Sequence, residues 1–308
     1  MTESALSGEA LERPGAAAAF VLAARPKTLA AAVVPVAVGT AVAYDHGAFA
    51  AGPALAALAV ALLVQIGTNY ANDYFDFVHG ADTEERIGPT RAVQAGLLSP
   101  RTMVAGTAAA FALAMVAGLY LVTVAGLPMI WIGLASIASG LWYTAGGRWS
   151  MGYLGLGDLF AFAFFGPVAV ATTTYVQARA WLPEAWLASL PVGLLTVAIL
   201  VVNNTRDLET DRASGKRTLA VRLGRRASVA EWGLAVVAAF AVPFVHWGLG
   251  WEGPWVLLPL AALPLAVGPW RALLRHRDGA RLNAALGATA RLLLAFGVLY
   301  AAAIALGT

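Results

Sequence analysis

The sequence predicts an all-α, multi-pass membrane protein, and three observations lead to this fold class. Of the 308 residues, 60% are hydrophobic and only 12% are charged, whereas soluble domains carry about 45–50% apolar and about 25% charged residues. Long runs of Ala, Leu and Val recur along the chain, and the mean hydropathy is +0.73. The absence of cysteine excludes disulfides, thiolate metal sites and a cysteine nucleophile.

Nine apolar segments predict nine transmembrane helices. Each contains about 17–22 residues, enough for a helix to cross a hydrocarbon core of about 30 Å. Internal Pro and Gly are compatible with such helices because neighbouring helices can satisfy the freed backbone groups. Residues 1–24 are predicted to form a polar tail, and residues 25–308 a single transmembrane domain. The predicted spans are residues 28–44, 51–71, 102–122, 127–145, 155–176, 186–203, 228–248, 253–270 and 286–306.

The basic residues predict the orientation of these helices. If the N-terminus lies inside and each segment crosses once, all but two of the 20 lysines and arginines fall in inside segments. The exceptions are Arg179, outside, and Arg291, within the last span. This asymmetry follows the positive-inside rule and predicts an N-in, C-out topology. It also argues against a nucleic-acid partner, despite a pI of about 9.4, because no soluble domain carries the charge.

Two stretches, residues 72–91 and 203–218, combine acidic, amide and basic side chains, and each begins where a predicted span ends. In the first stretch Asn72 and Asp76 are four residues apart, with Asp73 close to the same helical face. Carboxylates that share a helical face repel unless a cation lies between them. Oxygen ligands without His or Cys suit Mg²⁺, so this pattern predicts a magnesium site.

The second stretch repeats the pattern. It opens at Asn203, and its Asp207 and Asp211 are again four residues apart. Basic residues follow both acidic clusters, and carboxylates, a hard metal and cations together are typical of a diphosphate site. The candidate diphosphate-binding residues are Arg86, Arg91, Lys216 and Arg217.

Two other interpretations compete with this one. Ordinary solvated loops with salt bridges would also contain such charges, but they need not begin in the last turn of a membrane span, where desolvation is costly. An acid-lined transporter would place its acids near the bilayer midplane, in an inverted repeat. Here the acids lie at helix ends, beside Arg and Lys.

With these motifs in place, the sequence resembles the UbiA superfamily of intramembrane prenyltransferases over nearly the whole chain. The superfamily fold is nine transmembrane helices around a central cavity, which agrees with the number of apolar segments. The residues that carry the resemblance are 25–29, 72–91, Tyr143-Thr144, 155–159 with 164–166, and 203–223.

The resemblance implies a set of metal ligands. The first family motif supplies Asn and Asp ligands, and the second supplies two Asp four residues apart. The superfamily pattern has a third acid where this chain has Gly80, and the acid comes later, at Asp82. The segment 82–91 instead resembles the naphthoate subgroup. The candidate metal ligands are Asn72, Asp73, Asp76, Asp82, Asn203, Asp207 and Asp211.

The implied reaction is the transfer of a polyprenyl group from polyprenyl diphosphate to 1,4-dihydroxy-2-naphthoate, with loss of CO₂ and diphosphate, in menaquinone biosynthesis. Two Mg²⁺ ions are expected, and the catalytic candidates are Asp76, Asp207, Asp211 and Lys216. Family members acting on 4-hydroxybenzoate, homogentisate or haem are the alternatives. The expected location is a bacterial inner membrane, with the site facing the cytoplasm. The sequence predicts no oligomeric state.

Four polar residues within or beside spans are candidates for lining the substrate cavity. Asn69 lies one turn before Asn72, although interhelical hydrogen bonding is an equal alternative. Tyr143 could instead anchor at the interface, and Asp158 could cap a helix. Arg291 must face protein or water, where it would meet a substrate carboxylate or pair with another side chain.

Overall fold

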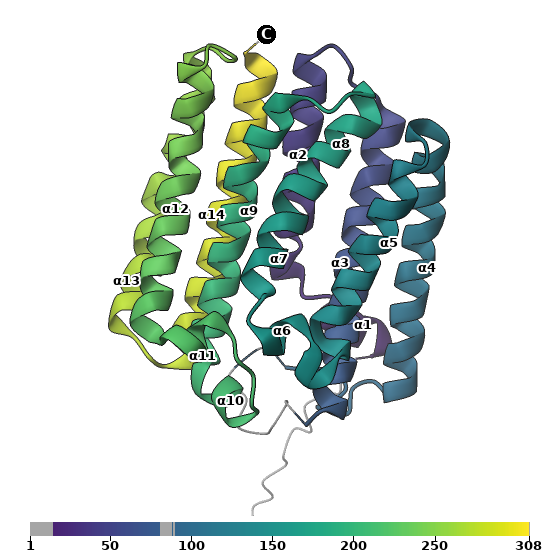
Figure 1. Cartoon of the computed structure of the whole chain (residues 1–308). Coiled ribbons are helices and arrows are strands. Elements are labelled where there is room, and N and C mark those ends of the chain that lie inside the picture. Colours follow the sequence, from purple (N-terminus) through teal and green to yellow (C-terminus); the bar gives the residue numbers. More distant parts are fainter. Residues whose placement is uncertain (1–14, 81–87, 89, 308) are drawn as a thin grey trace, which may run out of the picture.

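The computed structural model describes residues 15–80, 88 and 90–307, and these residues form helices and connecting segments without a strand. The helices stand side by side as a bundle (Figure 1). Their bounds are α1 (Ala16–Ala23), α2 (Ala30–Asp45), α3 (Ala51–Val78), α4 (Pro100–Ala125), α5 (Pro128–Ala145), α6 (Met151–Leu154), α7 (Gly157–Ala163), α8 (Ala169–Ala178), α9 (Pro183–Arg206), α10 (Leu208–Ala213), α11 (Leu219–Leu223), α12 (Arg225–Gly248), α13 (Val267–Arg275) and α14 (Gly279–Leu306).

Three helical breaks have local causes. A 3₁₀ segment, Pro26–Thr28, separates α1 from α2, and the two helical parts are bent by 55°. A π-helical turn, Phe164–Val168, contains Pro167 and joins α7 to α8, as expected where proline removes a backbone donor. A long 3₁₀ segment, Pro254–Ala266, contains further prolines and leads into α13.

The predicted count of nine spans is not confirmed. In the described part of the chain, seven helical segments are long and apolar enough to cross a membrane. The bent pair formed by residues 16–28 and α2 would be an eighth span if the two parts cross together. Helix α5 covers the predicted span 127–145 but is not one of them. Helix α5 carries Ser136 and Ser139, together with Trp142 and Tyr143, among its apolar residues.

Helix α9 is the centre of the packing. In its most apolar stretch, 72% of the residues are buried inside the bundle, the highest share among the seven candidate spans. It contacts α7, α12 and α14, and small residues allow close approach. A Cβ added to Gly166 would come within 3.0 Å of the Gly193 Cα on α9. Helix α9 is thereby held in the middle of the bundle.

The short helices gather at one end of the bundle. Figure 1 shows α6, α10 and α11 at the bottom, with the C-terminus at the opposite end. The described residues of both acidic stretches lie at this lower end, where α3 ends at Val78 and α9 ends at Arg206. The fold therefore brings together two segments that are more than a hundred residues apart in the sequence.

Candidate active site

A polar cavity lies between the two acidic clusters. Most of its lining side chains come from α3, α5, α9 and α10 and from the segments that follow α3 and α10. The segment between α1 and α2, the π-helical turn after α7, and helices α2, α6, α7 and α14 supply the rest. Its charged and amide-bearing lining residues are Arg25, Gln65, Asn69, Asn72, Asp76, Arg91, Asn203, Asn204, Asp207, Asp211 and Lys216. Most of the residues predicted from the two motifs thus meet at one site.

The first cluster is carried by the last turns of α3. Asp76 is buried, and its Oδ2 accepts from Arg91 Nη2 at 2.5 Å. Asn72, one turn earlier, accepts through Oδ1 from the Thr144 hydroxyl of α5 at 2.6 Å. Asp73 points elsewhere, since both its oxygens accept from backbone N–H groups further along the chain.

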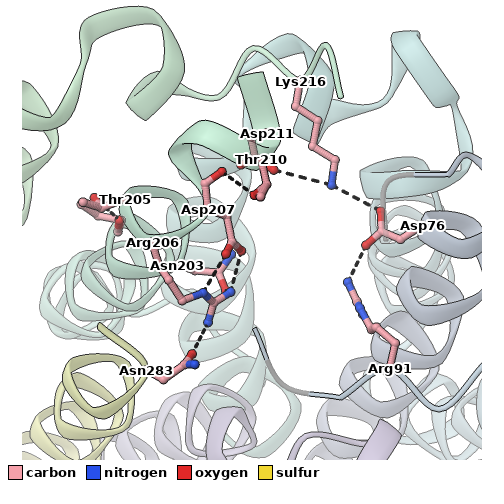
Figure 2. Close-up of polar contacts among 11 residues, drawn as sticks. Asp76, Arg91, Asn203, Thr205, Arg206, Asp207, Thr210, Asp211, Lys216 and Asn283 are labelled. Atoms are coloured by element: carbon pink, nitrogen blue, oxygen red, sulfur yellow. Dashed lines mark hydrogen bonds and ion pairs between the residues drawn. The ribbon is translucent and has the colours of Figure 1, made fainter. Parts of the chain in front are cut away.

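The second cluster begins where α9 ends. Arg206 is almost fully buried and donates to both oxygens of Asp207, at 2.7 and 2.5 Å. It also donates to Asn203 at 3.0 Å and to Asn283 of α14 at 2.6 Å (Figure 2). A buried arginine thus ties this acidic cluster to the last helix of the bundle.

Lys216 joins the two clusters. Its Nζ lies 3.4 Å from an oxygen of Asp76 and 3.9 Å from an oxygen of Asp211, and Figure 2 shows it between them. Burial acts to lower the pKa of Lys216, but the two carboxylates outweigh this and the pKa is raised. The structure therefore already holds a positive charge between carboxylates from both motifs.

A second cavity, which is mainly apolar, adjoins the polar one. Its lining includes Pro35, Val36, Ala57 and Phe164. The two cavities share Ala31, Gln65, Thr68, Tyr143, Ala161 and Phe165 as lining residues. Tyr143 therefore lies at the boundary between a charged space and an apolar one.

The described site does not include every predicted residue. Among the described residues, Arg217 and Arg291 are exposed, Asp158 is buried, and none of the three lines either cavity. Asp82 and Arg86 lie outside the described residues.

The sequence prediction missed several site residues. Arg206 is not among the sequence-based candidates, although a charged residue in the last turn of an apolar segment is itself a signal. Arg25 lines the polar cavity from a left-handed backbone conformation, φ 53°, that non-glycine residues rarely adopt. Thr144 belongs to the residues that carry the family resemblance, but its contact with Asn72 depends on packing between distant helices. The same holds for the contact between Asn283 and Arg206.

The lining oxygens suit a hard metal ion, although the ligands are not assembled. Among the described residues, no group of three His, Cys, Asp or Glu side chains could hold a metal ion. The acids are instead paired with Arg91, Lys216 and Arg206. The lining residues nevertheless fit Mg²⁺, because their donor atoms are carboxylate and amide oxygens. The Lys216 ammonium group already occupies a position for a cation between the two clusters.

The fold and the site together define a helical membrane protein whose cavity has a charged end and an apolar end, which suits a ligand with an anionic head and a hydrocarbon tail. Residues 32–299 match the UbiA prenyltransferase family, and the chain belongs to this family. The resemblance identified in the sequence is therefore confirmed.

Similar proteins carry a more specific name. The 1,4-dihydroxy-2-naphthoate octaprenyltransferase of Mycobacterium tuberculosis is 40% identical over 297 residues, covering 94% of this chain and 98% of that protein. The enzyme of the same name from Escherichia coli is 37% identical, covering 89% and 90%. A UbiA homologue from Archaeoglobus fulgidus, solved bound to GPP and Mg²⁺, has a TM-score of 0.60 at 15% identity, covering 92% and 99%. That structure shows a shared fold.

Proposed function

We propose that this chain transfers a polyprenyl group from polyprenyl diphosphate to 1,4-dihydroxy-2-naphthoate, in menaquinone biosynthesis. The observation that carries the proposal is the pair of adjoining cavities, one lined by acids and cations and the other by apolar side chains. The names of the similar naphthoate prenyltransferases support the choice of acceptor.

The reaction exchanges one bond for another at the prenyl carbon. The allylic C–O bond breaks, and diphosphate leaves with the bonding electrons. The electron-rich ring attacks the prenyl carbon, and its carboxylate leaves as CO₂. The apolar cavity excludes water from the carbocation, while Arg91 and Lys216 stabilise the charge on the departing diphosphate.

Two Mg²⁺ ions are expected to bind in the polar cavity. Bound metal would supply further positive charge at the diphosphate oxygens. Of the predicted ligands, five line the polar cavity and would hold the ions: Asn72, Asp76, Asn203, Asp207 and Asp211. Catalytic roles are proposed for Asp76, Asp207, Asp211 and Lys216. Asn69 and Tyr143 line the cavity and would contact the substrates.

We further infer nine membrane crossings, with α5 as one of them, in an N-in, C-out orientation. The distribution of Lys and Arg supports this topology. The acidic clusters lie at the same end of the bundle as the basic loop after α10, so the site would face the cytoplasm from a bacterial inner membrane. Residues 25–308 are then one transmembrane domain.

The proposal is tested with the full chain in bilayer nanodiscs, given a labelled polyprenyl diphosphate and Mg²⁺. Separate reactions offer 1,4-dihydroxy-2-naphthoate, 4-hydroxybenzoate and homogentisate. We expect a decarboxylated, prenylated product from the naphthoate alone. Prenylation of 4-hydroxybenzoate but not of the naphthoate would contradict the proposed acceptor.

The metal sites are tested with Asp76→Asn and Asp207→Asn. Each removes a negative charge with little change in shape, and we expect kcat to fall by about 100-fold or more. Excess EDTA should abolish transfer, and added Mg²⁺ should restore it. Transfer that persists in EDTA, or in both variants, would contradict a metal-dependent mechanism.

A further inference from the structure

Asp73 and Asp76 lie one helical turn apart on α3 but bind different parts of the same neighbouring segment. Asp73 accepts from the backbone N–H groups of Ala92 and Val93, at 2.9 and 3.0 Å. Asp76 binds the side chain of Arg91, at 2.5 Å. The end of α3 therefore holds three consecutive residues, two by their backbone and one by its side chain.

The Asp73 carboxylate compensates for a gap in local hydrogen bonding. The segment turns directly after Arg91, where the N–H of Ala95 donates to the Arg91 carbonyl at 2.9 Å. As at a helix N-terminus, the first N–H groups of such a turn lack acceptors within the turn. Ala92 is fully buried and Val93 nearly so, and an unpaired buried N–H is costly. Asp73 supplies both acceptors.

Asp73 also differs from its neighbours in access to the cavity. Its side chain is buried, with 2% exposure. Asn72 and Asp76 are among the described residues that line the polar cavity, and Asp73 is not. With both oxygens bound to backbone amides, Asp73 is better suited to holding a segment than to binding a metal ion.

Apolar contacts hold the same segment from the other side. Ala92, Val93 and Leu98 are buried in a cluster with Tyr70 of α3 and with residues of α1. The backbone after Arg91 is thus fixed by a carboxylate and by packing together. The Arg91 side chain, whose guanidinium binds Asp76, extends from this fixed backbone.

We propose that Asp73 is a positioning residue, which fixes the backbone after Arg91 and thereby aims its guanidinium at the donor diphosphate. The inference rests on the proposed function, because the diphosphate is the group that Arg91 would meet. Arginine recognises phosphate through a fixed fork of N–H donors, so a shifted backbone would misalign it.

The test measures binding of geranylgeranyl thiolodiphosphate, a donor analogue that ionises poorly, to the full chain in nanodiscs without an acceptor. Wild type is compared with Asp73→Asn, Arg91→Gln and the double variant. Asp73→Asn keeps one acceptor oxygen and the shape of the side chain, so it is the variant most compatible with folding. Asp278→Asn is the matched control, because Asp278 accepts from the Arg281 N–H at 2.9 Å at the start of α14.

For a positioning role, we expect Asp73→Asn and Arg91→Gln each to weaken analogue binding by about tenfold, a typical loss for a hydrogen bond to a charged group. The double variant should bind no more weakly than Arg91→Gln. The Mn²⁺ concentration for half-maximal analogue binding should rise in Asp76→Asn but not in Asp73→Asn. Hydrogen exchange at Ala92 and Val93 should increase in Asp73→Asn, and Asp278→Asn should match wild type.

Several results would overturn the inference. A rise in the Mn²⁺ requirement of Asp73→Asn would make Asp73 a metal ligand. Additive losses in the double variant would show that Asp73 acts independently of Arg91. Unchanged analogue binding in Asp73→Asn would remove the positioning role. If wild type binds the analogue but prenylates no acceptor, the proposed reaction fails and the binding comparison still decides the role of Asp73. If wild type binds no analogue, both proposals fail.

Discussion

The two acidic clusters share a spacing of four residues but are built in different ways. In the first, Asn72 and Asp76 lie on the uninterrupted helix α3. In the second, Asp207 lies at the break between α9 and α10, and the Asp211 N–H donates to the Asp207 carbonyl at 2.7 Å in the first turn of α10. The same sequence pattern therefore arises from a continuous helix in one case and a broken one in the other.

The clusters also differ in what holds them. Contacts to the following segment and to α5 fix the first, through Arg91 and Thr144. The second depends on Arg206, which links it to α14. From this difference we expect substitutions near the second cluster to affect folding most, and substitutions near the first to affect mainly substrate binding.

The largest effect is expected for Arg206→Met. Removing this buried cation leaves Asp207 without its bidentate partner, and breaking a buried ion pair typically costs about 3–5 kcal/mol. Denaturant unfolding in detergent, followed by circular dichroism, measures the free energy of unfolding. The control is Arg212→Met, whose exposed ion pair with Glu209 should contribute about 0–1 kcal/mol. Equal losses in the two variants would contradict the anchoring role of Arg206.

An intermediate effect is expected for Lys216→Met, which removes the cation shared by both clusters. Because Lys216 lies between Asp76 and Asp211, its loss should lower kcat/KM for the prenyl diphosphate by about 10- to 100-fold. Steady-state kinetics at saturating Mg²⁺ measure this loss, with Arg212→Met again as the control. Unchanged kinetics would mean that the two clusters work without a shared lysine.

The smallest effect is expected for Thr144→Val, which removes the hydroxyl that orients Asn72 in the first cluster. The loss of one buried hydrogen bond should reduce the free energy of unfolding by about 0.5–1.5 kcal/mol. The KM for the prenyl diphosphate should also rise, because Asn72 becomes free to rotate. Thr107→Val is the matched control, since its hydroxyl bonds only within α4 among the contacts described. A rise in KM in the control alone would contradict the role given to Thr144.

The membrane character and the two motifs could be predicted from sequence because both are local. The apolar segments can be found without knowledge of distant contacts. So can the four-residue spacing of Asn72 and Asp76, and that of Asp207 and Asp211. The predicted count of nine spans is not confirmed, since α5, which mixes apolar residues with Ser, Trp and Tyr, is not among the seven spans of the described residues. Asp73 shows the limit of spacing, because three residues on one turn can point to different partners.

The sequence by itself determined that this protein is a helical membrane protein of the UbiA family with two acid- and amide-bearing motifs. Local hydropathy and residue spacing carry that information. Only the tertiary structure decided which cations meet which acids. Arg206 reaches Asn283 and Lys216 reaches Asp76 across more than 70 residues of chain, and Arg217, next to Lys216, remains exposed. The physical reason is that helix packing, and not sequence proximity, brings opposite charges within the few ångströms over which they bind.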